Sequence, residues 1–455
     1  MSRASWAAVG LALGLSIAAV TALVTAGPLD PPAGPVASTY KTLSEVEPRI
    51  AISAANTPGD VDSLYRISQP GSYYLTGNII GVANKHGIEI DSDGVTLDLS
   101  GFELRGAAGM GPFDGVSTAR SGLRNIAVVN GSVRNWGGDG VDMASFFMNN
   151  GRVEHVMAAG NAGAGIRAGA RSTVLQCSAF ANGNAGIVAE YSTTVARCTA
   201  LDNTGAGISA LLGGCTVVEC PTEGNRGNGI SVGGGTTVLG CTARLNLGRG
   251  IEASAGCTVI SCAASDNNGV GIAVADGCTL ADCTANSNDA AGITAGNACS
   301  ITNCTSNGNG ISGIAVAGIA VADGCTIAGC TVNNSTGVGI SANNGCRIAG
   351  NMIRNNQLDG VRVNFSCVVA DNNCNGDGAA PGTHGAIAVI GQGNRIEGNS
   401  ISYADRGLYI TAGGNTVFRN SLKSCTVNFD IAVGNDVGPI GSTATATSPW
   451  ANIQY

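Results

Sequence analysis

The chain has 455 residues, of which 44% are hydrophobic, 12% are charged, 4% are aromatic and 70 are glycine. This composition excludes intrinsic disorder and favours thin layers of small side chains over a bulky aromatic core. The net charge of −8 argues against a nucleic-acid partner, which requires a basic face.

Residues 1–26 have the features of a signal peptide. Arg3 supplies the positive start, Trp6–Val24 is a run without charge, and small residues end the segment. The run is also long enough to act as an uncleaved anchor. Residues 27–39 are rich in Pro and Gly and predict a linker. We therefore expect an exported protein, secreted or held in the cell envelope, with no membrane span after the leader.

A glycine followed by an aliphatic residue recurs mostly every 21 or 22 residues. A period in the twenties signals a solenoid, and short Thr/Val/Ile runs between Asn, Asp and Gly predict three short strands per repeat. Repeats stacked about 4.8 Å apart would form a right-handed parallel β-helix of about 15 coils, roughly 70 Å long. The marker glycines are Gly87, Gly115, Gly140, Gly165, Gly186, Gly207, Gly229, Gly250, Gly271, Gly292, Gly313, Gly339, Gly360, Gly385 and Gly407.

The repeats predict one all-β domain with closed ends. We place the N-terminal cap at residues 40–77, with a short helix before Pro48. The β-helix follows at 78–425, and the C-terminal cap at 426–455. Caps are expected because a solenoid must cover its open ends.

Asparagine and cysteine recur at fixed places in the repeat. Asn246, Asn267 and Asn288 belong to a column that predicts a ladder of side chains hydrogen-bonded from coil to coil. Two further columns contain most of the seventeen cysteines. Three interpretations of these cysteines stay open: buried core thiols, disulfides between coils, and metal ligands.

The asparagine column and phrases such as Asn267-Asn-Gly-Val-Gly-Ile272 resemble the secreted right-handed β-helix repeat proteins. That superfamily includes pectate lyases and polygalacturonases. The resemblance covers about Gly71 to Ser424. More closely, the SYYLTGNI segment at Ser72 and the closing SPWANIQY resemble the ends of an uncharacterised bacterial group. The resemblance implies an architecture, but the scaffold hosts lyases, hydrolases, epimerases and non-enzymes.

The residue before the marker glycine is mostly small or uncharged in the middle of the chain, with Arg249 as an exception, and is ionisable near both ends. If the register holds, each set of three forms a short ladder with neighbours about 5 Å apart. The set near the N-terminus is His86, Asp114 and Asp139. The set near the C-terminus, a second candidate cluster, is Asp359, His384 and Arg406.

The N-terminal set is the first candidate site. The stretch from Asp139 to Asp142 loosely resembles the acidic motif of polygalacturonases, which implies that Asp114, Asp139 and Asp142 are catalytic. Two glycines replace the Asn-Thr of that motif, and its other conserved elements are missing. Asp before Gly is also ordinary turn chemistry, so a structural role stays open. We assign substrate binding to three neighbours, His86, Arg134 and Trp136.

These observations favour an exported, non-catalytic scaffold that is monomeric, needs no metal or cofactor, and binds extracellular polysaccharide. The alternative is a polysaccharide hydrolase or lyase with its acidic residues in the coils near 115–165. A lyase would use Ca²⁺ held by carboxylates.

Overall fold

The computed structural model describes residues 47–144, 150–310, 315–378, 382 and 384–455. The chain divides into two units, Met1–Pro48 and Arg49–Tyr455, and all the described strands belong to the second. The predicted leader, the linker and the short helix expected before Pro48 lie outside the described residues. Within the described ranges, no helix is long and apolar enough to cross a membrane.

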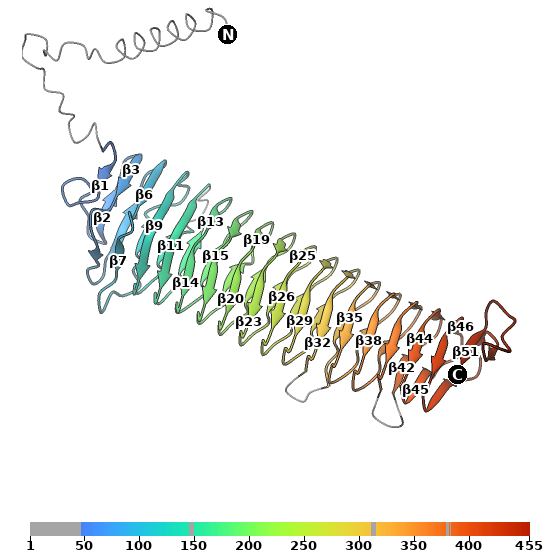
Figure 1. Ribbon diagram of the computed structural model, residues 1–455. Helices are drawn as coiled ribbons and strands as arrows, with labels where there is room; N and C mark the ends of the chain where they lie inside the picture. The colour runs from blue at the N-terminus through green and yellow to red at the C-terminus, as the bar shows by residue number, and fades with distance from the viewer. Residues whose placement is uncertain (1–46, 145–149, 311–314, 379–381, 383) are drawn as a thin grey trace, which may run out of the picture. The chain divides into compact units, whose positions relative to one another are not determined.

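Each coil of the second unit is built from three short strands that pair in parallel with those of the next coil (Figure 1). In one central coil these strands are β24 (Ile251–Ala253), β25 (Thr258–Ile260) and β26 (Ala263–Ser265). β24 pairs with β27 (Ile272–Val274), one coil further on. The predicted all-β, single-stranded parallel β-helix is confirmed.

The number of coils is about 18, so the prediction of about 15 was too low. The additional coils lie outside the span of the marker glycines. β2 (Ser63–Ile67) pairs in parallel with the first marked strand, and β48 (Val427–Ile431) pairs with the last. Neither strand follows the Gly–aliphatic pattern, so marker counting missed both.

The first strand of each coil belongs to a series of 17 parallel strands, named sheet B. The other strands form sheet A, which has 34 strands in two columns. β9 (Ala127–Arg134) and β11 (Arg152–Ala159) are long enough to contribute to both columns. Besides β2, β24, β27 and β48, sheet B contains β5 (His86–Ile90), β8 (Val116–Thr118), β10 (Val141–Met143), β12 (Ile166–Ala168), β15 (Ile187–Ala189), β18 (Ile208–Ala210), β21 (Ile230–Val232), β30 (Ile293–Ala295), β33 (Ile319–Val321), β36 (Ile340–Ala342), β39 (Val361–Val363), β42 (Gly385–Val389) and β45 (Arg406–Ile410).

The marker glycine is required by close packing between coils. In β24 the side chains of Ile251 and Ala253 are buried, whereas Glu252 faces outward. A Cβ atom on Gly250 would lie 2.5 Å from the carbonyl oxygen of Gly271 and 2.8 Å from the Asn267 side chain. No real Cβ tolerates such distances, so a side chain here would push neighbouring coils apart.

The predicted asparagine ladder is present and buried. The side-chain amide of Asn267 donates to Asn288 Oδ1 at 2.9 Å, and its backbone N–H donates to the same oxygen at 3.1 Å. The same pair of bonds joins successive members from Asn161 to Asn309. Each turn therefore satisfies its buried polar groups through the next coil.

All seventeen cysteines are free thiols, and all except Cys425 are buried. Within a column the backbone N–H of one cysteine faces the sulfur of the next, as for Cys177 and Cys198 at 3.4 Å. Asparagine takes over the same position toward the C-terminus, where Cys330 N–H donates to Asn351 Oδ1 at 2.8 Å. In both columns, a backbone N–H thus faces a side-chain acceptor in the next coil, which is sulfur for cysteine and Oδ1 for asparagine.

Candidate functional site

The predicted N-terminal ladder exists in the expected register. Val116 of β8 pairs with Val141 of β10 and follows Ile88 of β5 in sheet B. Asp114 and Asp139 each lie two residues before their strand, and His86 begins β5. The three ionisable residues therefore occupy equivalent places in consecutive coils.

The ladder is stabilised by hydrogen bonds in which backbone N–H groups donate to carboxylate oxygens of the preceding coil. Asp114 Oδ1 accepts from the N–H of Asp139 at 2.6 Å, and Asp139 Oδ1 accepts from the N–H of Ala164 at 2.5 Å. The N–H of Asp114 donates to Nδ1 of His86 at 3.0 Å. These Asp side chains thus carry structural bonds from one coil to the next.

Arg167, which we did not select from the sequence, also belongs to this group. It lies on β12 opposite Asp142 of β10. Its Nε donates to Asp139 Oδ2 at 2.8 Å and is 3.9 Å from Asp142 Oδ1. Asp142 also accepts from the N–H of Ala144 at 2.9 Å. In most repeats, the residue two places after the marker glycine is the central residue of a sheet B strand and points outward. Inspection of this position in each repeat would have identified Arg167.

Burial changes the proton affinities in this acidic group. It raises the pKa of Asp114 to about 7 and also raises the pKa of Asp142. Burial lowers the pKa of His86, whose ring packs edge-on against Phe113 with centroids 5.0 Å apart. Asp114 is therefore a group able to exchange a proton near neutral pH.

The two other residues assigned to substrate binding lie elsewhere. Trp136 is 1% exposed, and its Nε1–H donates to the carbonyl oxygen of Leu104 at 3.1 Å. The ring lies in the core, where it fills space beside Gly87 and Gly115. Arg134 belongs to β9 in sheet A and pairs with Glu103. Trp136 thus lies in the core beneath this part of sheet B, and Arg134 lies on sheet A, so neither side chain faces outward beside the acidic group.

The C-terminal set is only partly in register. Gly385, rather than His384, pairs with Arg406, so the expected alignment of His384 was wrong by one residue. Asp359 is buried, accepts from the N–H of Gly385 at 2.7 Å, and lies 3.6 Å from His384 Nδ1. Its partner is Arg362, whose Nε donates at 2.6 Å. Arg406 instead pairs with the carboxylate of Asp430, Nε to Oδ2 at 3.2 Å.

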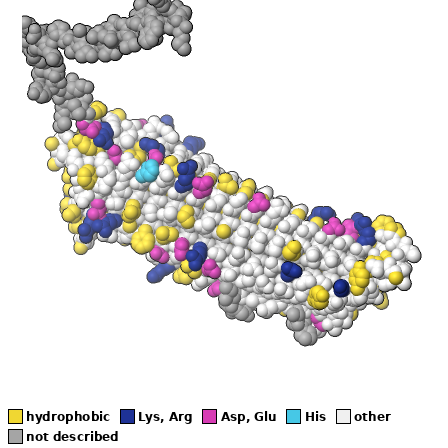
Figure 2. Space-filling model, in the orientation of Figure 1, with side chains coloured by type: hydrophobic (Ala, Val, Ile, Leu, Met, Phe, Trp, Pro, Cys, Tyr) yellow, Lys and Arg dark blue, Asp and Glu magenta, His cyan; other side chains and the backbone are white. Residues whose placement is uncertain are grey.

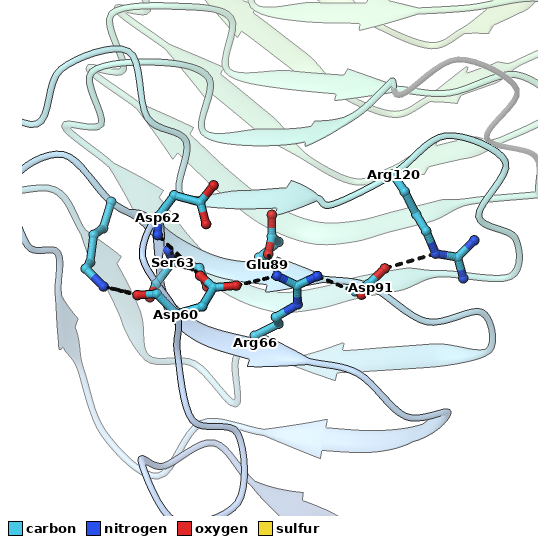
Figure 3. Close-up of polar contacts among 8 residues, drawn as sticks. Asp60, Asp62, Ser63, Arg66, Glu89, Asp91 and Arg120 are labelled. Atoms are coloured by element: carbon cyan, nitrogen blue, oxygen red, sulfur yellow. Dashed lines mark hydrogen bonds and ion pairs between the residues drawn. The ribbon is translucent and has the colours of Figure 1, made fainter.

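A third charged group was not predicted and lies at the first coils of sheet B (Figure 3). Arg66 bonds to Asp60 and, through Nη2 at 2.8 Å, to Asp91, which also accepts from Arg120. Ser63 donates to Asp60 and, with Arg66, lowers the pKa of that carboxyl. This group is a salt-bridge network that connects three neighbouring coils.

Carboxylate oxygens of Asp60, Asp62 and Glu89 lie within 4.8 Å of one another. Within the described ranges this is the only such grouping of three His, Cys, Asp or Glu ligands. Arg66 already bonds to Asp60 and lies 3.2 Å from Glu89 Oε2. The guanidinium therefore supplies the positive charge that a bound cation would otherwise bring.

A groove of about 530 Å³ lies over the middle of sheet B. Its floor includes three outward side chains in register, Glu252, Ala273 and Thr294. Leu211 and Arg249 line it as well, and Arg249 pairs with Glu252. On the face drawn in Figure 2, charged side chains form small separate groups and most of the surface is uncharged. The groove thus offers small and polar groups with one ion pair.

Two family models match the chain. The model described as "Right handed beta helix region" matches residues 67–247. The model described as "Periplasmic copper-binding protein (NosD)" matches residues 212–359 and 307–437. No curated protein matches the chain.

Several solved structures are similar to the chain at low identity. The A-module of Azotobacter vinelandii mannuronan C-5 epimerase AlgE4 is 13% identical, with a TM-score of 0.27, over 81% of this chain and 91% of that one. The tailspike protein 3 of bacteriophage CBA120 is 12% identical, with a TM-score of 0.31, over 89% of this chain and 60% of that one. The periplasmic alginate epimerase AlgG is 12% identical, with a TM-score of 0.27, over 89% and 80%.

Proposed function

Because the chain is a right-handed parallel β-helix repeat protein, we propose that it is an exported, non-catalytic scaffold that binds polysaccharide along sheet B. The family model that covers much of the C-terminal half describes periplasmic proteins, which supports export. The expected leader at residues 1–26 supports it independently.

The groove over sheet B is the observation that carries the proposal. Ser231, Glu252, Ala273 and Thr294 follow one another in register, so each coil presents one side chain to the same line along the sheet. A polymer with a regular repeat can lie along such a line and contact several coils at once. The small side chains of Ala273 and Thr294 leave room for it, and the Arg249–Glu252 pair offers polar contacts.

The hydrogen bonds made by Asp114, Asp139 and Asp142 support the hypothesis that the protein is not catalytic. Polysaccharide hydrolysis requires two carboxyl groups free to face the scissile bond. Asp139 is occupied by a backbone N–H and by Arg167, and Asp114 accepts a backbone N–H. Asp142 accepts the N–H of Ala144. Such bonds are those of turn-stabilising aspartates.

The enzymatic alternative has one observation in its favour, the raised pKa of Asp114 and Asp142. A carboxyl that keeps its proton near pH 7 is suited to general acid catalysis. A lyase would in addition need Ca²⁺. The grouping of Asp60, Asp62 and Glu89 offers the oxygen ligands for it, but Arg66 lies among them.

Copper, named in the description of one family model, does not fit the described residues. Copper prefers imidazole and thiolate ligands. The thiols of both cysteine columns are buried and bonded to neighbouring backbone, as Cys278 is to Ser254. Each of the three histidines, His86, His155 and His384, lies beside an Asp or Glu carboxylate rather than a second histidine or thiol. The proposal therefore includes no copper chemistry.

Electrophoresis through gels that contain polygalacturonate, alginate, dextran or galactomannan tests the proposal. We expect at least one polymer to retard the protein. Thr294→Arg fills the groove and should abolish the retardation, whereas Thr284→Arg, the matched change on sheet A, should leave it intact. Equal retardation of both variants would remove the groove as the binding site.

Product release from the same polymers separates the scaffold from the enzyme. We expect no new reducing ends and no unsaturated products. Release that disappears in Asp139→Asn would establish the enzymatic alternative at the acidic group. Release that is unchanged in Asp139→Asn would place an active site elsewhere.

A further inference from the structure

A second cavity, of about 420 Å³, opens at the C-terminal end of sheet A. Two strands and the segment that follows them form it: β46 (Thr416–Phe418), β49 (Asp436–Val437) and residues 438–450. This end lies many coils from the sheet B groove (Figure 1). The cavity is therefore separate from the surface to which the preceding proposal refers.

Trp450 forms one wall of this cavity and is held in place. Its ring meets Phe418 edge-on, with centroids 5.3 Å apart and an interplanar angle of 81°. The backbone N–H of Trp450 donates to Ser448 Oγ at 3.2 Å, and its backbone carbonyl oxygen accepts from the backbone N–H of Arg419 at 3.4 Å. Trp450 nonetheless remains 54% exposed, whereas Phe418 is 8% exposed. Although it covers Phe418, Trp450 thus keeps a large exposed surface that a ligand can contact.

Asp436 supplies a polar group next to this ring. It stands opposite Thr416, with both side chains on the cavity wall. Its backbone N–H donates to the carbonyl oxygen of Asn415, and within the described part of the chain its carboxylate makes no hydrogen bond or ion pair. An available carboxylate beside an exposed indole suits a ring that has an apolar C–H face and hydroxyl groups at its edge.

The nearby arginines argue against an anionic ligand. Arg395 and Arg419 both donate to Glu397 Oε2, at 2.8 and 2.7 Å. Both guanidinium groups also pack over the Phe418 ring, at 5.1 and 5.3 Å from its centroid. Arg419 in addition lies 5.8 Å from the centroid of the Trp450 ring, so a ligand would stack on the other face of the indole. They are therefore already paired, and Asp436 would repel the carboxylate of a uronic acid.

We propose that this cavity is a saccharide-binding site that stacks one neutral hexopyranose ring on Trp450 while Asp436 accepts hydrogen bonds from its hydroxyls. The site acts on its own and does not depend on the sheet B groove. A neutral sugar at the end of a chain, or a branch of a longer polymer, can enter it from the end of the β-helix.

Tryptophan fluorescence tests the site directly. Of the three tryptophans in the sequence, Trp136 is in the core and Trp450 is in the cavity. The full chain is titrated with linear tetrasaccharides of glucose, mannose or galactose, and with a galacturonate tetrasaccharide as the anionic comparator. We expect a saturable change in emission with at least one neutral sugar and none with the galacturonate.

Variants identify the residues responsible. Trp450→Ala should abolish the change, and Asp436→Asn should weaken binding about tenfold, the loss expected for a charge-assisted hydrogen bond. Tyr191→Ala removes an aromatic that is 55% exposed elsewhere and should bind as the unaltered chain does. Thr294→Arg should also bind normally, which separates this site from the groove.

Three results would overturn the proposal. These are no saturable change with any neutral tetrasaccharide, a change that persists in Trp450→Ala, and binding of the galacturonate alone. Far-ultraviolet circular dichroism of each variant establishes that the β-helix is folded, so a loss of binding reports on the site. Calorimetric titration repeats the measurement without fluorescence.

Discussion

The side-chain amide of Asn246 donates to Asn267 Oδ1 at 2.9 Å, and the backbone N–H of Asn246 donates to the same oxygen at 3.1 Å. Asn267 in turn donates to the carbonyl oxygen of Ala243 at 3.0 Å. One buried amide therefore satisfies groups in two coils. Its removal would leave several buried polar groups without partners.

Asn267→Ala should lower the free energy of unfolding by about 3 kcal/mol, because unpaired buried donors and acceptors each cost about 1–3 kcal/mol. The neighbouring Asn268 is exposed, and Asn268→Ala should change stability by less than about 0.5 kcal/mol. Urea denaturation followed by circular dichroism measures both. Equal stability of the two variants would show that the ladder contributes little.

Asp114 should make stability depend on pH. Burial raises its pKa in the folded chain to about 7, above the usual aspartate value of 3.8, so folding favours the protonated form. Its contribution to stability is fully present below about pH 4 and is lost as the pH rises through about 7. Asp114→Asn keeps an acceptor for the Asp139 N–H but removes the charge.

We therefore expect Asp114→Asn to be more stable than the unaltered chain at pH 8, on the order of 2 kcal/mol, with the difference disappearing below about pH 4. Asp282→Asn, on an exposed residue, is the matched control and should show no such trend. The measurement is urea unfolding at several pH values. A gain of Asp114→Asn that grows toward low pH would contradict the sign derived from burial.

The thiols of the cysteine columns should not react with thiol reagents in the folded protein. Sixteen of the seventeen thiols are buried and none is in a disulfide. We expect Ellman's reagent to detect at most one thiol per native chain, the half-buried Cys425, and all seventeen in denaturant. A lower count in denaturant, restored by reductant, would instead reveal disulfides between coils.

Gly163 should be intolerant of a side chain. A Cβ atom there would lie 2.1 Å from Asp139 Oδ1 and 2.8 Å from the Gly138 carbonyl carbon. Gly163→Ala should cost about 2 kcal/mol of stability because the backbone must shift. A Cβ atom on Gly77 meets nothing within 4 Å, so Gly77→Ala should lie within about 0.5 kcal/mol of the unaltered chain. Differential scanning calorimetry compares them.

The repeat could be predicted because coil stacking turns a sequence period into a spatial column. The asparagine ladder and the alignment of His86, Asp114 and Asp139 follow directly from the spacing. His384 departs from its column because the pairing of β42 starts at Gly385, a shift that the glycine pattern does not reveal.

Side-chain direction was harder to predict than position. We assigned Trp136 to substrate binding because it is aromatic. Trp136 follows strand β9, however, and its side chain points into the core, where it cannot contact a sugar. Arg167 and Arg362 occupy the outward central positions of their strands and pair with the aspartates. The Trp450 cavity depends on how the last segment folds back over β46, which no repeat encodes.

One irregular coil bears on how such a chain changes length. Ile293 pairs with Ile319, a step of 26 residues where most steps are 21. Gly318 therefore takes the place expected for Gly313, which lies outside the described residues. Ile319 then pairs with Ile340 at the usual distance. The additional residues do not interrupt the parallel strand pairing with the coils on either side. Evolution can therefore enlarge one coil by inserting residues between its strands without disturbing the coils on either side.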